Sequence, residues 1–264
     1  MVNKIFFSII FSSIIFSEDA IKVEFGNGTS NLSDFSMKIQ DGNESFEIEV
    51  KRLRSNLRGL NFAIEEGYDN QFLNMLFNVI SATGDGITVR SSGNEYFPTI
   101  ELGRLSYSLN NWDINVSDGG LVGGPSLDAK ININQFKVVP PRQFTRNLSE
   151  EEWKILKVFY QDGSFSIKKI SFDINLSKER LFSLNAQIDL PVGKASIKSK
   201  LSIPVNFKGD PYIESTEINL TSLTPGLKEV IDQLLASSEE IPFKKKGSGY
   251  SLKFSGELNS LRFY

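Results

Sequence analysis

The chain contains no cysteine and no histidine, and these two absences exclude several kinds of functional site. Without histidine there is no Ser-His-Asp triad, no Cys-His pair and no HExxH zinc site. Without cysteine there is no disulfide framework, zinc knuckle, iron–sulfur cluster or thiol nucleophile. The sequence therefore predicts no catalytic residues, no cofactor site and no metal site, and we expect a protein that is not an enzyme.

An excess of positive charge is also absent. The 264 residues include 29 Lys and Arg against 32 Asp and Glu, which gives a formal net charge of −3. Proteins dedicated to nucleic acids usually carry a net basic face, so nucleic acid is not an expected partner. Hydrophobic residues make up 40% of the chain and Phe alone occurs 21 times. A chain of this size and composition can build its core without disulfides or metals.

The N-terminus has the three parts of an export signal. A short basic start, Met1–Lys4, precedes Ile5–Phe16, which consists of Ile, Phe and Ser, and the polar stretch Ser17–Ala20 follows. As a helix, this apolar stretch would span about 18 Å, which is short of the roughly 30 Å hydrocarbon core of a bilayer. The pattern predicts that residues 1–17 are a secretory signal peptide. A retained signal that attaches the protein to the inner membrane is the alternative.

Composition indicates the compartment. A secreted eukaryotic domain of this size usually has disulfides, and this chain has no cysteine to form them. Asn, Ile, Lys and Phe are abundant, and all four have AT-rich codons. We therefore expect a protein of the periplasm of an AT-rich Gram-negative bacterium.

The body of the chain alternates apolar and polar residues with the period of a β-strand. Leu127–Ile133 alternates strictly, and the pattern then slips by one position near Asn134–Gln135. A second slip falls at Lys168–Lys169, and each slip predicts a β-bulge. Further strands are predicted over residues 182–190, 195–203 and 250–263. Because each strand has one apolar and one polar side, the pattern favours an antiparallel sheet with one wet face.

Three segments depart from the strand period and predict helices. Residues 69–82 place Phe72, Leu73, Leu76 and Phe77 at helical spacing. Ser149 and Glu152 match a capping box before an apolar stripe that ends at residue 159. Thr224-Pro225 supplies an N-cap and a first-turn proline for a helix that continues to residue 235. We expect these helices to cover the apolar face of the sheet, with a partner-binding groove helix as the alternative.

The best internal break is the proline-containing stretch that begins at Val139. It divides the chain into an N-terminal β half with one helix, residues 18–138, a connection at residues 139–148, and a C-terminal β half with two helices, residues 149–264. Whether the halves form one continuous sheet or two domains stays open at this point.

Motifs with chemical meaning are few, and each has a plainer interpretation. The glycine-rich stretch 118–125 is neither a dinucleotide fingerprint nor a P-loop, and it is typical of a turn between strands. Asp113, Asn115, Ser117 and Asp118 lack the spacing of an EF-hand loop. Lys244–Lys246 suits either anionic lipid headgroups or a solvated turn. The remaining candidates are carboxylate clusters that a glycoside hydrolase would need in a cleft: Glu65-Glu66, Glu150–Glu152 and Glu239-Glu240.

The C-terminal hundred residues resemble a known group of envelope proteins. The similar run begins with Gly163–Phe172, continues through the alternating strands to Ile218–Leu220, and includes the helix Leu227–Leu235. It closes on the hairpin 249–258, which ends with an apolar strand followed by Gly, any residue and Leu. This pattern is similar to the AsmA-like envelope proteins, closest in style to the type II secretion system protein N family.

The resemblance implies a location and a role. Members of the group have a long, curved sheet with an apolar concave face between the two membranes, and larger relatives are implicated in moving lipids. Secretion-linked members are accessory proteins without catalytic residues. The expected partners are therefore phospholipid or other acyl chains and proteins of the envelope or secretion machinery.

The expected fold is mainly β: a long antiparallel, twisted and curved sheet, like a half-barrel or a sandwich, with about three short covering helices. If the sheet is open, its apolar side forms a groove for acyl chains; in a closed sandwich the same side chains are fully buried. The candidate groove residues are Phe165, Ile167, Ile170, Phe172, Ile174, Leu184, Ile188, Ile197, Leu201 and Ile203.

The function predicted from the sequence is that of a non-enzymatic periplasmic accessory protein, linked to type II secretion or to lipid handling. The alternative is a secreted or surface-displayed binding module, such as an adhesin or a carbohydrate binder. A carboxylate hydrolase is the third hypothesis.

Overall fold

The structure is a computed structural model of the full chain. It describes residues 7–17, 20–41, 44–66, 71–92, 96–117, 120–121, 126–141, 143–144, 148–204, 210–237, 242–257 and 259–264.

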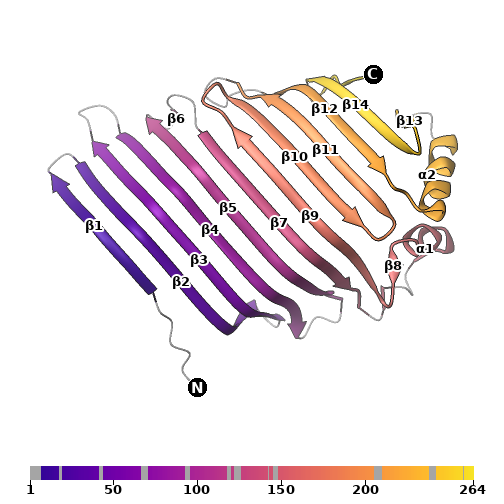
Figure 1. The fold of residues 1–264 in the computed structure, drawn as a ribbon, viewed down its shortest axis with the longest axis horizontal. Helices are drawn as coiled ribbons and strands as arrows, with labels where there is room; N and C mark the ends of the chain where they lie inside the picture. Colours follow the sequence, from indigo (N-terminus) through magenta and orange to yellow (C-terminus); the bar gives the residue numbers. More distant parts are fainter. Residues whose placement is uncertain are drawn as a thin grey trace.

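The described residues form one antiparallel sheet with two short helices at one end (Figure 1). Twelve strands follow one another in the order β1-β2-β3-β4-β5-β7-β9-β10-β11-β12-β14-β13, and three short strands pair beside this path. The strands of the N-terminal part are β1 (Phe7–Ser17), β2 (Ala20–Asp41), β3 (Glu44–Glu66), β4 (Gln71–Ser92), β5 (Thr99–Ser117), β6 (Gly120–Leu121) and β7 (Ser126–Val139). Those of the C-terminal part are β8 (Tyr160–Gln161), β9 (Ser164–Leu176), β10 (Leu181–Leu190), β11 (Gly193–Ser202), β12 (Tyr212–Thr221), β13 (Lys244–Lys246), β14 (Gly249–Glu257) and β15 (Arg262–Phe263).

The sheet continues across the proline-containing connection. Strand β7 ends at Val139, before Pro140 and Pro141, and its ladder partner is β9, which lies on the other side of the connection. The pairing runs from Leu127↔Leu176 to Val138↔Phe165. The two predicted halves therefore share one sheet, which answers the alternative that the sequence leaves open.

The predicted slips in the alternation lie in a row that crosses several strands. We call this row the crease; it consists of Lys51, Gly86, Gly103, Gln135 and Lys168 on β3, β4, β5, β7 and β9. Two of these residues have a positive φ, 60° at Gly86 and 56° at Gln135. The pairing has the same register on both sides of the crease, as in Asn134↔Lys169 and Phe136↔Ile167.

The crease confirms the irregularities predicted at Asn134–Gln135 and Lys168–Lys169 but corrects their nature. A β-bulge adds a residue to one strand and shifts its register. Here two paired strands change their alternation of apolar and polar residues at the same position. The pairing register is therefore the same on both sides of the crease, although the alternation in each strand is shifted by one residue. The apolar residues on either side of the crease consequently stay on one face of the sheet.

The helix predicted over residues 69–82 is wrong, because residues 71–82 belong to strand β4. A second row of slipped positions, Gly59, Asn78 and Asn111, crosses β3, β4 and β5. At Asn78 the alternation of β4 moves by one, so Phe77 and Ile80 share a face although they are three residues apart. A strand with such a slip shows the i, i+3 spacing of a helix. Residues 69 and 70 lie outside the described residues.

The other two predicted helices are confirmed. Helix α1 (Glu150–Leu156) begins at the predicted capping box, in which the Glu152 N–H donates to Ser149 Oγ at 3.2 Å and the Ser149 N–H donates to Glu152 Oε2 at 2.8 Å. The bond from the Ser149 N–H, followed by a bond that the Ser149 hydroxyl donates to the same Glu152 oxygen at 2.8 Å, lowers the pKa of the Glu152 carboxyl. Helix α2 (Pro225–Ser237) starts with proline, and the Lys228 N–H donates to the Thr224 carbonyl at 3.0 Å. Both helices lie at the C-terminal end of the sheet (Figure 1), so they do not cover its whole face.

The sheet is open, so the closed sandwich that the sequence leaves as an alternative is excluded. The accessible surface of the whole chain is 17177 Å², whereas a compact 29.6 kDa monomer would expose about 11,600 Å². Fully buried hydrophobic residues in the described part of the chain are correspondingly few and mostly small: Val50, Phe77, Ala82, Ala129, Ala186, Val192, Ile213, Leu227 and Tyr250. The architecture is thus a single extended layer, within the range of half-barrel and sandwich-like shapes that the sequence predicts.

Candidate functional site

Apolar side chains form continuous cross-strand rows on one side of the sheet, which we call the apolar face. In antiparallel pairs, residues directly opposite each other lie on the same face and contact each other. One row runs over eight strands from β4 to β14: Ala82, Tyr107, Ile131, Phe172, Ala186, Ile197, Ile218 and Leu252. A neighbouring row runs from β5 to β14: Leu105, Ile133, Ile170, Ile188, Ala195, Leu220 and Tyr250.

The structure brings the predicted groove residues together on the apolar face. Phe172 and Ile197 belong to the first row, and Ile170 pairs with Ile188 in the second. Ile174 pairs with Leu184 in a third row. Ile167 and Leu201 extend the same face along their strands, and Ile203 follows the end of β11, where its N–H donates to the Arg180 carbonyl at 3.0 Å. All ten predicted residues are half-buried, so the face is accessible.

Phe165 lies in a more enclosed environment than the other groove residues. Its ring centroid is 5.0 Å from Tyr160 and 5.9 Å from Phe144. Tyr160 in turn contacts Trp153 of α1, with 5.2 Å between the ring centroids. These aromatic contacts link α1 to the start of β9. Phe165 therefore closes this corner of the apolar face.

The apolar face extends beyond the residues predicted from the sequence. The row of Ile174 continues through Ala129 and Leu109 to Ile80 and Leu57, which places it on β7, β5, β4 and β3 as well. Phe77 stacks on Trp112 at 5.2 Å with an interplanar angle of 13°. The alternation of Leu127–Ile133 signals part of this extension. The part on β4 is missed because its slipped pattern predicts a helix.

The opposite face is polar and carries ion pairs between neighbouring strands. Arg90 Nε lies 2.9 Å from Glu47 Oε2, and Arg104 Nε lies 2.6 Å from Asp85 Oδ1. The hydrogen bond from Arg104 lowers the pKa of Asp85. Asp128 accepts hydrogen bonds from Asn111 and Asn175, which lower its pKa. Exposed pairs of this kind contribute little to stability, but they keep one face of the sheet in water.

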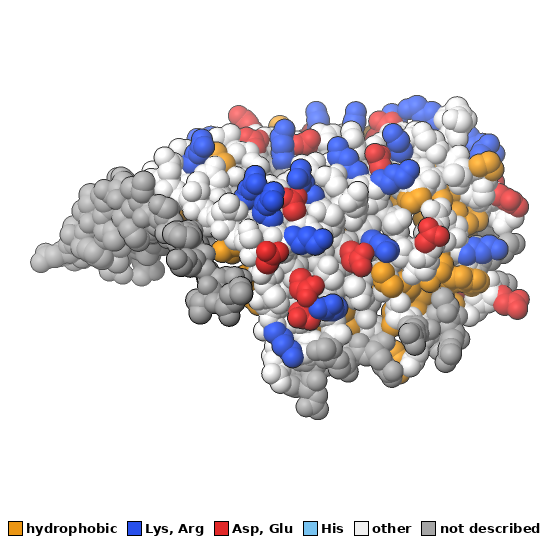
Figure 2. Space-filling model, turned by 60° about the horizontal axis from the view of Figure 1, so that its bottom comes forward, with side chains coloured by type: hydrophobic (Ala, Val, Ile, Leu, Met, Phe, Trp, Pro, Cys, Tyr) orange, Lys and Arg blue, Asp and Glu red, His pale blue; other side chains and the backbone are white. Residues whose placement is uncertain are grey.

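Figure 2 shows charged side chains of both signs spread over one side of the molecule. Hydrophobic side chains gather toward the end where α1 and α2 lie in Figure 1. The side of the molecule seen in Figure 2 is therefore divided into a broad charged area and a more local apolar area.

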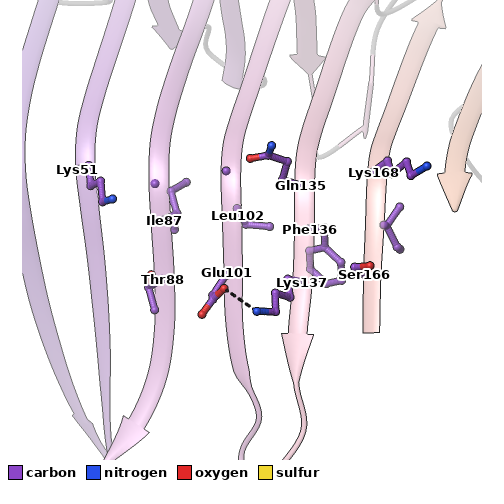
Figure 3. Close-up of a pocket in the computed structure, with 13 residues that line it drawn as sticks. Lys51, Ile87, Thr88, Glu101, Leu102, Gln135, Phe136, Lys137, Ser166 and Lys168 are labelled. Atoms are coloured by element: carbon purple, nitrogen blue, oxygen red, sulfur yellow. Dashed lines mark ion pairs between the residues drawn. The ribbon is translucent and has the colours of Figure 1, made fainter. Parts of the chain in front are cut away.

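A hollow of about 580 Å³ follows the crease across five strands (Figure 3). Gly86 and Gly103 leave space in which neighbouring side chains lie: a Cβ at Gly86 would come within 2.7 Å of Lys51 Cδ, and a Cβ at Gly103 would collide with the Gln135 side chain. Lys137 Nζ lies 3.7 Å from Glu101 Oε2 at the same hollow. The hollow thus combines charged, hydroxyl and amide groups with the apolar side chains of Ile87, Leu102, Phe136 and Ile167.

Some of the other residues singled out by the sequence make structural contacts. Asp113 accepts a hydrogen bond from Asn115 at 3.1 Å and pairs with Lys178 at 3.4 Å. Lys244–Lys246 forms the edge strand β13, where exposed lysines discourage pairing with other chains. Most of the glycine-rich stretch 118–125, and Glu239-Glu240, lie outside the described residues. Among the described residues, no group of three or more Asp and Glu side chains is placed to hold a metal ion.

Comparisons with protein-family models, with curated proteins and with solved structures give no match. Among the helices in the described part of the chain, none is both long and apolar enough to cross a membrane.

Proposed function

We propose that this protein is a non-enzymatic accessory protein of the bacterial periplasm that binds acyl chains of lipids on its apolar face. The carrying observation is that the apolar rows run across an open sheet and that most of their large side chains are only half-buried. Soluble proteins rarely expose large contiguous apolar areas, and those that do usually bind a partner or ligand there. A long, narrow hydrocarbon chain suits cross-strand rows that continue over eight strands.

The sequence supports the periplasmic part of the proposal. Residues 1–17 have the pattern of a secretory signal, and the C-terminal hundred residues resemble AsmA-like envelope proteins, closest to the type II secretion system protein N family. Both features suit a protein that handles lipids between the membranes or assists secretion. The missing residue types support a role without catalysis, because neither histidine nor cysteine occurs in the chain.

The test is to identify what the protein carries. The chain is expressed with its own signal in a Gram-negative host, the periplasmic fraction is purified, and an organic extract is analysed by mass spectrometry. We expect phospholipid or another acyl lipid in stoichiometric amount. A monodisperse, lipid-free protein would contradict acyl-chain binding and direct the search to protein partners of the secretion machinery.

A pair of variants makes the test specific to the apolar face. Phe172 lies in the middle of the long apolar row, and the neighbouring Ser171 points to the opposite face. Phe172→Asp places a charge among apolar side chains and is expected to abolish loading. Ser171→Asp adds the same carboxylate on the polar face and should load like the wild type. Equal loading of both variants would show that lipid binds elsewhere.

The crease hollow favours the second candidate function, a secreted or surface-displayed binding module. Its hydroxyl, amide and charged groups beside an apolar floor that includes the Phe136 ring suit a carbohydrate, which presents both hydroxyl groups and apolar ring faces. Oligosaccharide binding that is lost in Gln135→Ala, with lipid extraction negative, would favour this function over lipid handling.

A further inference from the structure

An apolar cavity of about 260 Å³ lies between helix α2 and the C-terminal end of the apolar face. The sheet contributes Leu190, Ala195 and Leu220, and Phe159 and Leu223 contribute from connecting segments. The apolar stripe of α2 forms the remaining wall, with Leu227, Val230, Ile231 and Leu234. Lys194 is the single charged residue of the lining.

The position of α2 over this cavity is held at two points. At the start of the helix, the Thr224 N–H donates to the Val192 carbonyl at 2.8 Å. Near its end, the Tyr250 hydroxyl donates to Asp232 Oδ1 at 2.6 Å, and Lys245 Nζ lies 3.0 Å from the same oxygen. The cavity lies beneath a helix that is anchored to the sheet on both sides of it. Its walls therefore belong to the folded structure.

The volume of the cavity selects for a narrow ligand. Apolar cavities of about 150 Å³ bind molecules as small as benzene, and sites for drug-sized ligands occupy about 300–1,000 Å³. A cavity of 260 Å³ has room for part of one hydrocarbon chain and not for two chains side by side. A single-chain amphiphile therefore suits it better than a diacyl phospholipid.

The exposure of the rim indicates where such a ligand enters. Leu234 is 43% exposed, which provides an apolar entrance from solvent. Lys194 directly precedes Ala195 of the second apolar row, so its side chain points to the opposite face of the sheet. The cavity therefore selects for the hydrocarbon chain and not for the charge of the headgroup.

We propose that this cavity binds the hydrocarbon chain of a single-chain amphiphile, such as a long-chain carboxylate, with its headgroup in solvent at the entrance beside Leu234. The inference rests on the proposed function, since the cavity lies at the end of the same apolar face. It adds a defined site and a chain number.

The first measurement is isothermal titration of the delipidated protein with saturated carboxylates of increasing length, each below its micelle concentration. Affinity should rise about fourfold for each added methylene until the cavity is filled, and then level off. Absence of binding, or an affinity that does not change with chain length, would overturn the proposal.

Two bulk-matched variants locate the site. Val230 lines the cavity, whereas Gln233 is exposed on the same helix. Val230→Trp should weaken dodecanoate binding at least tenfold, and Gln233→Trp should not change it. If Val230→Trp fails to fold, Leu234→Lys places a charge at the exposed rim and should weaken dodecanoate binding at least fivefold. Unchanged binding in the folded variant would show that the chain lies elsewhere.

The proposal that the open apolar face binds phospholipid and the proposal that the cavity binds a single-chain amphiphile can be refuted separately. Phe172 does not line the cavity, so Phe172→Asp should abolish phospholipid loading and retain dodecanoate binding. If Phe172→Asp abolishes loading and Val230→Trp binds dodecanoate normally, the proposed function stands and the cavity assignment falls. If Val230→Trp abolishes dodecanoate binding and no phospholipid is loaded by the wild type, the cavity assignment stands without the wider function.

Discussion

The hydroxyl of Tyr250 on strand β14 donates a hydrogen bond of 2.6 Å to Asp232 on helix α2. Tyr250 is 1% exposed and lies at the end of an apolar row, so its ring is buried while its hydroxyl reaches a charged partner. Burial, together with Asp232, raises the pKa of Tyr250 to about 12. The hydrogen bond from Tyr250, followed by that from Lys245, lowers the pKa of Asp232.

Replacing Tyr250 by Phe should loosen α2 from the sheet without leaving a large void. Hydrogen bonds to charged groups are among the stronger ones in proteins, and their loss leaves Asp232 without this donor. We expect Tyr250→Phe to lower the melting temperature by about 2–6 °C. Thermal unfolding followed by circular dichroism measures the change. Tyr212→Phe is the control, because Tyr212 is 49% exposed, and an equal effect in both variants would contradict this role of the hydroxyl.

The same pair predicts a dependence of stability on alkaline pH. The folded protein favours the protonated phenol, because the pKa of Tyr250 is raised from 10.0 to about 12. Its contribution to stability is therefore fully present below pH 10 and is lost as the pH rises from about 10 to about 12. For Asp232 the pKa is lowered, so its contribution is present above the ordinary value of 3.8 and is lost as the pH falls through the lower folded value.

Tyrosinate absorbance during an alkaline titration should show one phenol that ionises late, together with unfolding of the protein. Tyr250→Phe should remove this late step. Retention of the step in the variant would assign it to another tyrosine.

Two glycine substitutions should have opposite effects on stability. A Cβ at Gly249 would collide with the carbonyl oxygen of Leu220, which is part of strand β12 and cannot move aside. Gly249→Ala should therefore lower the free energy of unfolding by about 3 kcal/mol. Around Gly226 in α2 nothing lies within 4 Å of an added Cβ, so Gly226→Ala should raise it by about 0.5–1 kcal/mol. Urea denaturation measures both values, and a neutral Gly249→Ala would contradict this close approach of β14 and β12.

Stability should depend more on the apolar face than on the ion pairs of the polar face. Phe77 is 4% exposed and stacks on Trp112, so Phe77→Ala should lower the free energy of unfolding by about 3 kcal/mol. It should also change the fluorescence of Trp112. Arg104→Ala removes an exposed ion pair with Asp85 and should produce no measurable loss. Urea denaturation followed by fluorescence compares the two, and a greater loss in Arg104→Ala would contradict this division.

Export should remove the first 17 residues. In the structure Phe7–Ser17 is strand β1, at the edge of the sheet, and its neighbour in the strand order is β2. Strand β2 also pairs with β3, from Ala20↔Glu65 to Asp41↔Glu44, and this pairing does not involve β1. The signal peptide stays a prediction, and its removal should leave the rest of the sheet folded. Intact-mass analysis of the periplasmic protein should give a chain that begins at Glu18. Ile10→Lys should block export, and a periplasmic chain that starts at Met1 would contradict cleavage.

The sequence by itself determined the local properties of this protein. The alternation around Ile131 and Phe172 predicts strands with one apolar and one polar face, because successive side chains of a strand point in opposite directions. Ser149 with Glu152, and Thr224 with Pro225, predict two helix starts, because capping depends on side chains within one turn. Most of the candidate apolar face could be predicted for the same reason.

The tertiary structure alone decided which residues become neighbours. Strand β4 has the spacing of a helix, and only its pairing with β3 and β5, with a shared slip at Asn78, makes it a strand. The adjacency of β7 and β9 joins the two halves across the prolines, and the course of α2 leaves a cavity beside Ala195. Whether an apolar face is covered depends on where segments far apart in the sequence pack. Local sequence patterns carry no information about which of these segments come together. For this reason the open layer, the alignment of the predicted slips into one crease and the cavity beneath α2 follow from the fold and could not be predicted from the sequence.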